Sequence, residues 1–156
     1  MNIQQKKLVA NIVTVVLFTT VMIVGFANIK NIINRSESMR AMDLVGKEIL
    51  EYRKQYGALP NETYVNQFIE KTGIVRLGEL QYRAQWIEFG AKSNETILAY
   101  TEKNFGGFVK SGYIVLWLDG RIEWINEKHF EKIISEQQQK QELQWLHEHL
   151  NNQNQF

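Results

Sequence analysis

The sequence contains one long uncharged stretch, LVANIVTVVLFTTVMIVGFANI, which runs from Leu8 to Ile29 between Lys6-Lys7 and Lys30. A helix rises 1.5 Å per residue, so a helix of this length covers about 33 Å, enough to cross the hydrocarbon core of a bilayer. A cleaved signal peptide has a shorter apolar region and a small-residue exit, whereas this stretch ends in Phe26-Ala27-Asn28-Ile29. The sequence therefore predicts a transmembrane helix over residues 8–29, with a cleaved signal or a buried core helix as the alternatives.

The composition limits the function classes. The 18 basic and 17 acidic side chains give a net charge of +1, which provides no field for gathering nucleic acid. The absence of cysteine excludes a disulfide framework, a thiol nucleophile and thiolate metal sites, and it is compatible with either side of a membrane. Outside the apolar stretch the chain has room for one small domain with a single modest core.

The charges that flank the span do not decide its orientation, because Lys6 and Lys7 lie at one end and Lys30, Arg35 and Arg40 at the other. Size favours one arrangement. Only seven residues precede the span, so we expect residues 1–7 in the cytoplasm and the folded body on the far side of the membrane.

The helical pattern continues beyond the bilayer. Apolar residues recur at spacings of three and four, with one longer gap across Ser36. They are Ile29, Ile32, Ile33, Met39, Met42, Val45, Ile49, Tyr52 and Tyr56. Gly57 then suits a C-terminal cap, and Pro60 forbids continuation. We expect one helix of roughly fifty residues, whose second half lies against a domain of its own chain.

The middle of the chain predicts a short helix and the first strands. The short helix begins at Asn61 or Thr63 and ends at Gly73. Alternation then predicts a strand from Leu80 to Trp86 that continues to Phe89 across a bulge. We expect a turn over residues 90–94, a second strand over 96–101 and a glycine-rich loop over 103–112, without the Lys-Ser/Thr of a phosphate-binding loop.

The clearest local signal is YIVLWLDGRIEWI, from Tyr113 to Ile125. Two strand-like runs flank Asp119-Gly120, a dipeptide that suits a two-residue type I′ turn because both of its residues accept positive φ. Asn126 is then placed to cap a final helix.

In that final helix the apolar side chains change face. Phe130, Ile133 and Ile134 share one side, whereas a second set falls on nearly the opposite side of a straight helix. The second set is Leu143, Leu146 and Leu150. Either the helix breaks between Gln137 and Gln141, or the Gln-rich tail presents its second stripe to a partner or a membrane, or the tail frays into disorder.

The long N-terminal helix, the segment YRKQYGALP from Tyr52 to Pro60 and the small antiparallel sheet together resemble a type IV pilin or a type II secretion pseudopilin. The resemblance extends to about residue 135. It is nearest to the bacterial variant whose sheet ends in an Asp-Gly hairpin followed by a short helix, here Ile114–Trp124 and Glu127–Phe130. It implies a structural membrane protein of a bacterial envelope, in the inner membrane, that assembles through its N-terminal helix.

The sequence differs from the family pattern at three places. Family members are cleaved after a glycine, and no leader of that kind is expected here. The family has a glutamate at the fifth position of the mature chain, about where Gln5 stands, and no acid occurs before Glu37. A histidine often precedes the Asp-Gly by ten positions in the family, and Val109 stands there.

The candidates for chemistry have simpler structural interpretations. His147 and His149 are two residues apart, which points them to different sides of a helix and is wrong for joint chelation. His129 has acidic residues nearby, including Glu127, Glu131 and Glu136, but a solvated helix face explains them equally well. We expect no catalytic, cofactor or metal residue, no small-molecule substrate, and no enzymatic activity.

An aromatic platform for a polymer is the remaining binding hypothesis, and the core of a small sheet is the favoured interpretation of the same residues. The residues are Tyr82, Trp86, Tyr100, Tyr113, Trp117 and Trp124.

The sequence thus predicts an α+β protein with four parts: residues 1–7 in the cytoplasm, a transmembrane helix over 8–29, a pilin-like head over 30–135 and a polar helical tail over 136–156. Its expected partners are the bilayer and other pilin-like subunits or further copies, contacted through the N-terminal helix. The alternative is a single-pass scaffold that never polymerises and binds a partner through its head or its C-terminal helix.

Overall fold

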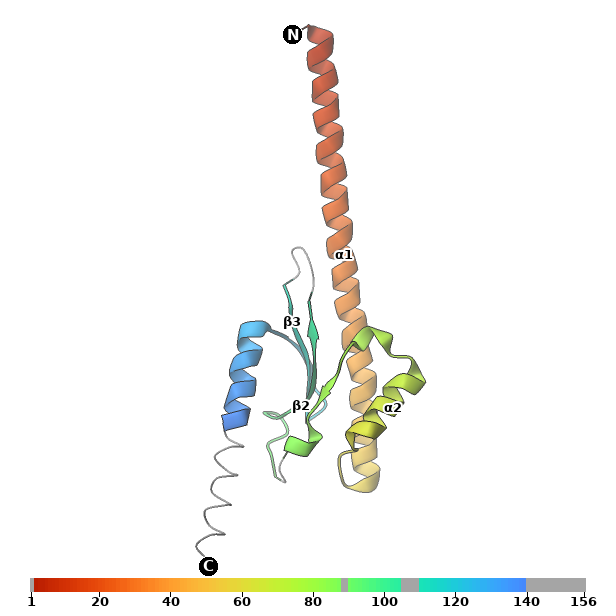
Figure 1. The fold of residues 1–156 in the computed structure, drawn as a ribbon, viewed down its shortest axis with the longest axis vertical. Helices are drawn as coiled ribbons and strands as arrows, with labels where there is room; N and C mark the ends of the chain where they lie inside the picture. The colour runs from red at the N-terminus through yellow and green to blue at the C-terminus, as the bar shows by residue number, and fades with distance from the viewer. Residues whose placement is uncertain (1, 88–89, 105–109, 140–156) are drawn as a thin grey trace, which may run out of the picture.

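The structure, a computed structural model, describes residues 2–87, 90–104 and 110–139 (Figure 1). Its helical elements are α1 (Ile3–Tyr56), α2 (Glu62–Thr72) and the single turns η1 (Val75–Leu77) and η2 (Ala84–Trp86). Its strands are β1 (Gln81–Tyr82), β2 (Ile97–Lys103), β3 (Gly112–Trp117) and β4 (Ile122–Asn126). The chain is helical again over residues 127–139. The predicted α+β class is confirmed.

Helix α1 is continuous over 54 residues, as predicted (Figure 1). It begins where the Asn2 backbone N–H donates to Oε1 of Gln5 at 3.0 Å. It ends at Gly57, whose φ of 74° lets its N–H donate to the Arg53 carbonyl at 2.8 Å. Among the described residues it is the one helix long and apolar enough to cross a membrane, and none of its apolar window is buried. This is compatible with a single-pass membrane protein.

The head covers less of α1 than the apolar spacing predicts. Ile29, Ile32 and Ile33 remain about half exposed, and burial begins at Ser38. The buried face of α1 also includes small residues that the pattern of large apolar side chains does not identify, such as Gly46. A Cβ added at Gly46 would lie 2.8 Å from Cδ1 of Leu116. Close approach of helix and sheet therefore depends on small side chains as well as on the predicted stripe.

The four strands form one antiparallel sheet in the order β1-β2-β3-β4. Helix α1 packs on one face, and residues 127–139 lie on the other, so the sheet is the middle of three layers (Figure 1). Ile114 and Leu116 face α1 beside Met42 and Val45. On the opposite face, Val115 and Trp117 pack with Ile97, Ile125 and Phe130.

The predicted strand from Leu80 to Phe89 is wrong in its extent over the described residues, because β1 contains only Gln81 and Tyr82, and Phe89 lies outside the described residues. The Arg83 N–H still donates to the Leu98 carbonyl, but the N–H groups of Trp86 and Ile87 turn back to the carbonyls of Arg83 and Ala84. The one register shift recorded in the sheet's described residues lies in β2, between Ile97 and Ala99, and not in this segment.

The predicted hairpin is confirmed, but its predicted type I′ turn is wrong. No described residue other than glycine has positive φ, and only Gly120 of the pair does, at 90°. The Gly120 N–H donates to the Trp117 carbonyl, and the Trp117 N–H donates to Arg121. The loop therefore has three residues, 118–120, with a glycine bulge, which is the next most common hairpin geometry.

Both predicted helix caps are present. The Asn61 side chain accepts the Tyr64 N–H at 2.8 Å at the start of α2, which ends at Gly73. The Asn126 side chain accepts the His129 N–H at 3.0 Å. Phe130 is buried, and Ile133 and Ile134 pack beside it, as their shared face predicts. The change of face beyond Gln137 involves Leu143, Leu146 and Leu150, which lie outside the described residues.

Candidate functional site

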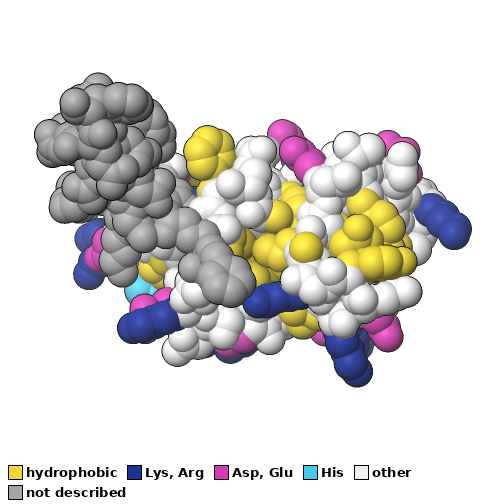
Figure 2. Space-filling model, turned by 90° about the horizontal axis from the view of Figure 1, so that it is seen from below, with side chains coloured by type: hydrophobic (Ala, Val, Ile, Leu, Met, Phe, Trp, Pro, Cys, Tyr) yellow, Lys and Arg dark blue, Asp and Glu magenta, His cyan; other side chains and the backbone are white. Residues whose placement is uncertain are grey.

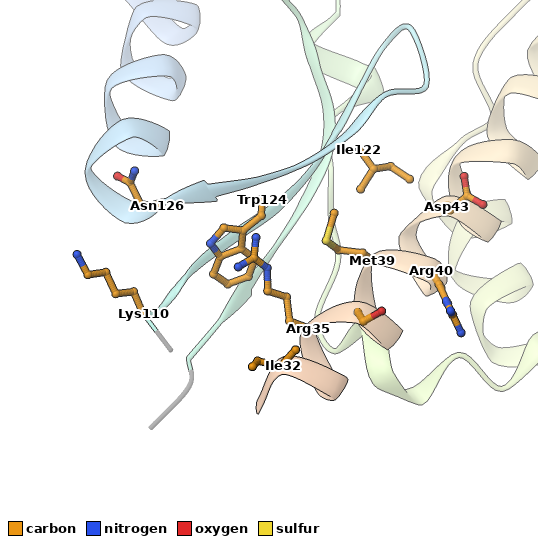
Figure 3. A pocket seen from close by; sticks show the side chains of 10 residues that line it. Ile32, Arg35, Met39, Arg40, Asp43, Lys110, Ile122, Trp124 and Asn126 are labelled. Carbon is orange, nitrogen blue, oxygen red and sulfur yellow. The ribbon is translucent and has the colours of Figure 1, made fainter. Parts of the chain in front are cut away.

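A broad groove of about 940 Å³ separates α1 from the last strand of the sheet (Figure 3). It lies at the end of the head that faces the apolar half of α1, because its α1 wall begins at Ile32, three residues after the span. Its lining consists of Ile32, Arg35, Ser36, Met39, Arg40, Asp43, Lys110, Ile122, Trp124 and Asn126. The groove therefore lies beside the junction between the exposed apolar half of α1 and the head.

One cation crosses the groove. Arg35 extends from α1 and places its guanidinium carbon 4.4 Å from the centre of the Trp124 ring on β4 (Figure 3). A guanidinium at this distance is attracted to the negative face of the indole. Partial burial lowers the pKa of Arg35, and since an arginine titrates far above neutral pH it stays charged here. The contact holds both side chains in place without neutralising the charge.

Gly112 makes room for the indole. It lies on β3 opposite Asn126, and an added Cβ would be 2.9 Å from Cζ2 of Trp124 and 2.5 Å from the Ile125 carbonyl oxygen. The second of these atoms belongs to the backbone and cannot move without disturbing the β3–β4 pairing. A side chain at position 112 would therefore force the strands apart and displace Trp124 from Arg35.

We expect Gly112→Ala to lower the free energy of unfolding by about 2 kcal/mol, in the range of overpacked cores. Denaturant unfolding of the full chain in detergent, followed by tryptophan fluorescence, measures this. Gly25→Ala is the control, because nothing lies within 4 Å of an added Cβ there. An unchanged unfolding midpoint for Gly112→Ala would contradict the assigned role of Gly112.

The groove carries a net positive charge. Its one acid, Asp43, is already paired with Lys47 at 2.6 Å. Within the described parts of the chain, no carboxylate forms an ion pair with Arg35, Arg40 or Lys110. The arrangement suits an anion held between α1 and β4.

A second hollow, of about 510 Å³, has the opposite character. Glu79 and Glu102 line it together with three aromatic rings. Tyr113 stacks on Phe130 at 3.9 Å between ring centres, and Tyr100 lies 4.7 Å from Phe130. Burial, followed by the nearby glutamates, raises the pKa of Tyr113. Through these ring contacts, the helix over residues 127–139 packs against the sheet.

A third aromatic group lies at the end of the head farthest from the apolar half of α1. The ring of Tyr52 lies 4.5 Å from that of Tyr56 and 4.7 Å from that of Tyr64. The Tyr64 hydroxyl donates to the carboxylate of Glu48, which raises the pKa of Tyr64 to about 12. Figure 2 shows this end of the molecule, with hydrophobic side chains exposed between charged ones.

The structure separates the residues of the aromatic-platform hypothesis. Tyr82 is buried against α1, whereas Trp117 is buried on the other face of the sheet. Trp86 is 58% exposed, and Trp124 faces the groove. The prediction that most of these residues serve as core is confirmed: Tyr82 and Trp117 are buried, and Tyr100, Tyr113 and Trp124 are partly buried against the same clusters. No common platform forms from the six.

The predicted surface position of His129 is confirmed on the exposed side of its helix. His147 and His149 lie outside the described residues, as do residues 105–109 of the glycine-rich loop. Within residues 2–87, 90–104 and 110–139, no group of three or more metal-binding side chains occurs.

Sequence reasoning missed the pairing of Arg35 with Trp124. It treated Arg35 as a flanking charge of the span and Trp124 as core. The sequence did contain one signal. Gly112 is two residues before Ile114, so both lie on the same face of β3, and Ile114 pairs with Trp124. Because glycine has no side chain, it leaves room for the indole on that face.

Comparisons of the chain with protein-family models, with curated proteins and with solved structures find no match.

Proposed function

We propose that this chain is a single-pass membrane protein with a structural role, a pilin- or pseudopilin-like subunit of an envelope filament or secretion-type assembly. The observation that carries the proposal is the continuity of α1, whose exposed apolar half passes without interruption into a half that is buried against an antiparallel sheet. One helix thus serves as both anchor and backbone of the head. In the proposed arrangement the N-terminus is cytoplasmic and the head lies outside the inner membrane.

The surface of α1 between the span and the head supports lateral assembly. Ile29, Ile32 and Ile33 are 54%, 59% and 49% exposed, and Gly25 lies one turn before them with open space around it. Exposed aliphatic side chains beside a glycine permit close packing of a neighbouring helix.

The test is the size of the assembly that full-length protein forms in mild detergent, measured by light scattering after gel filtration. We expect large assemblies for the native chain, and at least a tenfold loss of the assembled fraction for Gly25→Leu or for Ile32→Glu. Val75→Glu is the control, since Val75 is 86% exposed on the head. A native chain that runs as a monomer or dimer would exclude the subunit role.

One observation favours the alternative, a scaffold that does not polymerise. Gln5 stands about where the resemblance implies an assembly glutamate, and its side chain accepts the N–H of Asn2 in its own chain. In that case, deletion of residues 140–156 should abolish capture of the partner while the head stays folded. The deletion begins after Gln137, because that side chain donates to the Glu95 carbonyl at 2.7 Å.

A further inference from the structure

We propose that the groove between α1 and β4 binds the phosphate of an anionic phospholipid in the leaflet nearest the head. The proposal rests on the membrane anchoring in the proposed function, and it adds a specific lipid site to it. Three features carry it: the depth of the groove, its charge and its aromatic wall.

The depth follows from the helix rise. Arg35 lies six residues beyond the end of the apolar span, or about 9 Å along α1. The polar layer of a bilayer is about 5–8 Å thick on each side. The guanidinium of Arg35, which stacks on Trp124 of the head, therefore lies at the aqueous edge of this layer, where the phosphate of a lipid headgroup can meet it. Arg40 lies about 8 Å further along α1, on the aqueous side.

The charge of the groove matches such a ligand. Arg35 is central, while Arg40 and Lys110 lie at its two margins (Figure 3). Asp43, the acid among the lining residues, is bound to Lys47 and offers little repulsion. A guanidinium presents a planar set of donors that fits phosphate oxygens, and stacking on Trp124 leaves the edge of that plane open to a ligand.

The remaining lining suits the part of a lipid just below its phosphate. Ile32 and Met39 on α1 and Ile122 on β4 are aliphatic, and Trp124 adds an indole. Tryptophan is enriched at membrane interfaces because one side of the ring is apolar and its N–H is polar. A soluble acidic peptide would gain nothing from a site at this depth, whereas a lipid headgroup is already there at high local concentration.

The experiment places the full chain in nanodiscs of neutral phosphatidylcholine and raises the fraction of phosphatidylglycerol. The readout is the indole N–H resonance of Trp124, identified by its loss in Trp124→Phe. We expect a shift that saturates as phosphatidylglycerol rises. Inorganic phosphate added to discs of phosphatidylcholine alone should leave the resonance in place, which distinguishes a lipid headgroup from a free anion.

Variants then test the cations. Each basic side chain near an anionic surface contributes about fivefold in binding. We expect Arg40→Gln and Lys110→Gln each to raise the midpoint of the titration about fivefold. Arg35→Lys keeps the charge and should change the midpoint less than Arg35→Gln. Arg53→Gln removes one charge from the same helix, about 27 Å beyond Arg35, and should leave the midpoint unchanged.

The outcomes separate the two proposals. If the chain does not enter discs of any composition, the anchoring itself is wrong. If the chain enters the discs but phosphatidylcholine and phosphatidylglycerol act alike, or if Arg53→Gln weakens binding as much as Arg40→Gln does, the lipid site is wrong and the anchoring stands. If inorganic phosphate alone reproduces the shift, the groove is a general anion site and the lipid assignment is overturned.

Discussion

Replacing Val45 with aspartate is expected to unfold the head. The Val45 side chain is fully buried in the core between α1 and the sheet, beside Met42 and Leu116. An isolated carboxylate in such a place has no cation to pair with and must either stay charged in an apolar environment or take up a proton. We expect a loss of at least about 3 kcal/mol in the free energy of unfolding, a large share of the stability of a small domain. Near-ultraviolet circular dichroism of the detergent-solubilised chain measures the loss of tryptophan packing.

The adjacent residue provides the control. Leu44 precedes Val45 on the same helix but is 54% exposed, because successive helical residues point about 100° apart. Leu44→Asp introduces the same charge into α1 at nearly the same level and should change the free energy of unfolding by no more than about 0.5 kcal/mol. Equal effects of Leu44→Asp and Val45→Asp would contradict the packing of α1 on the sheet.

The second large effect is expected in the span. Leu17 and Val21 lie one turn apart near the centre of the apolar half, 62% and 68% exposed. Replacing both with arginine changes the cost of membrane insertion by about 6 kcal/mol, from the difference between aliphatic residues and arginine at a helix centre. We expect the double variant to leave the membrane fraction that resists carbonate extraction, in which the native chain is retained.

Leu44→Arg adds a cation to the same helix outside the span and should remain in the membrane fraction. The head core begins at Ser38, so the span substitutions touch none of it, and a head domain that stays protected from protease in the double variant confirms that only anchoring is lost. Retention of the double variant after carbonate extraction would show that the apolar half does not anchor the chain.

The long helix was predictable because independent signals agree. The uncharged run predicts the first half of the helix, and the apolar residues that recur every three or four positions predict the second half. Gly57 and Pro60 predict its end. The exact boundary of the head on α1 was not predictable, since it depends on where the sheet approaches. Ser38, Ala41 and Gly46 are buried because of that approach and not because of their hydrophobicity.

The sheet was predictable in its number of strands but not in its details. The alternation from Leu80 to Trp86 predicts a full strand, yet the backbone leaves the sheet after Tyr82 and turns into η2. The length of this strand depends on how far β2 runs beside it, which the alternation does not contain. Five consecutive buried residues from Ile114 to Leu118 did contain a signal that was not used. A strand covered on both faces has a continuous apolar run, which indicates that a second layer covers the sheet opposite α1.

The candidate site depended on tertiary structure. Arg35 and Trp124 come from opposite ends of the domain, and their contact follows from the register that pairs Trp124 with Ile114 and from the position of the hairpin against α1. Periodicity places each residue on a face of its own element, but it does not say which faces meet.

The unbroken path of α1 out of the span has a mechanical consequence. The 27 residues from Lys30 to Tyr56 form a rigid extension about 40 Å long, continuous with the proposed membrane span. Spanning helices tilt by about 20° on average, and the tilt responds to bilayer thickness. A swing of that size displaces the far end of the extension sideways by about 14 Å. In the proposed membrane-anchored arrangement, the thickness of the bilayer therefore sets the direction in which the head and its distal tyrosines point.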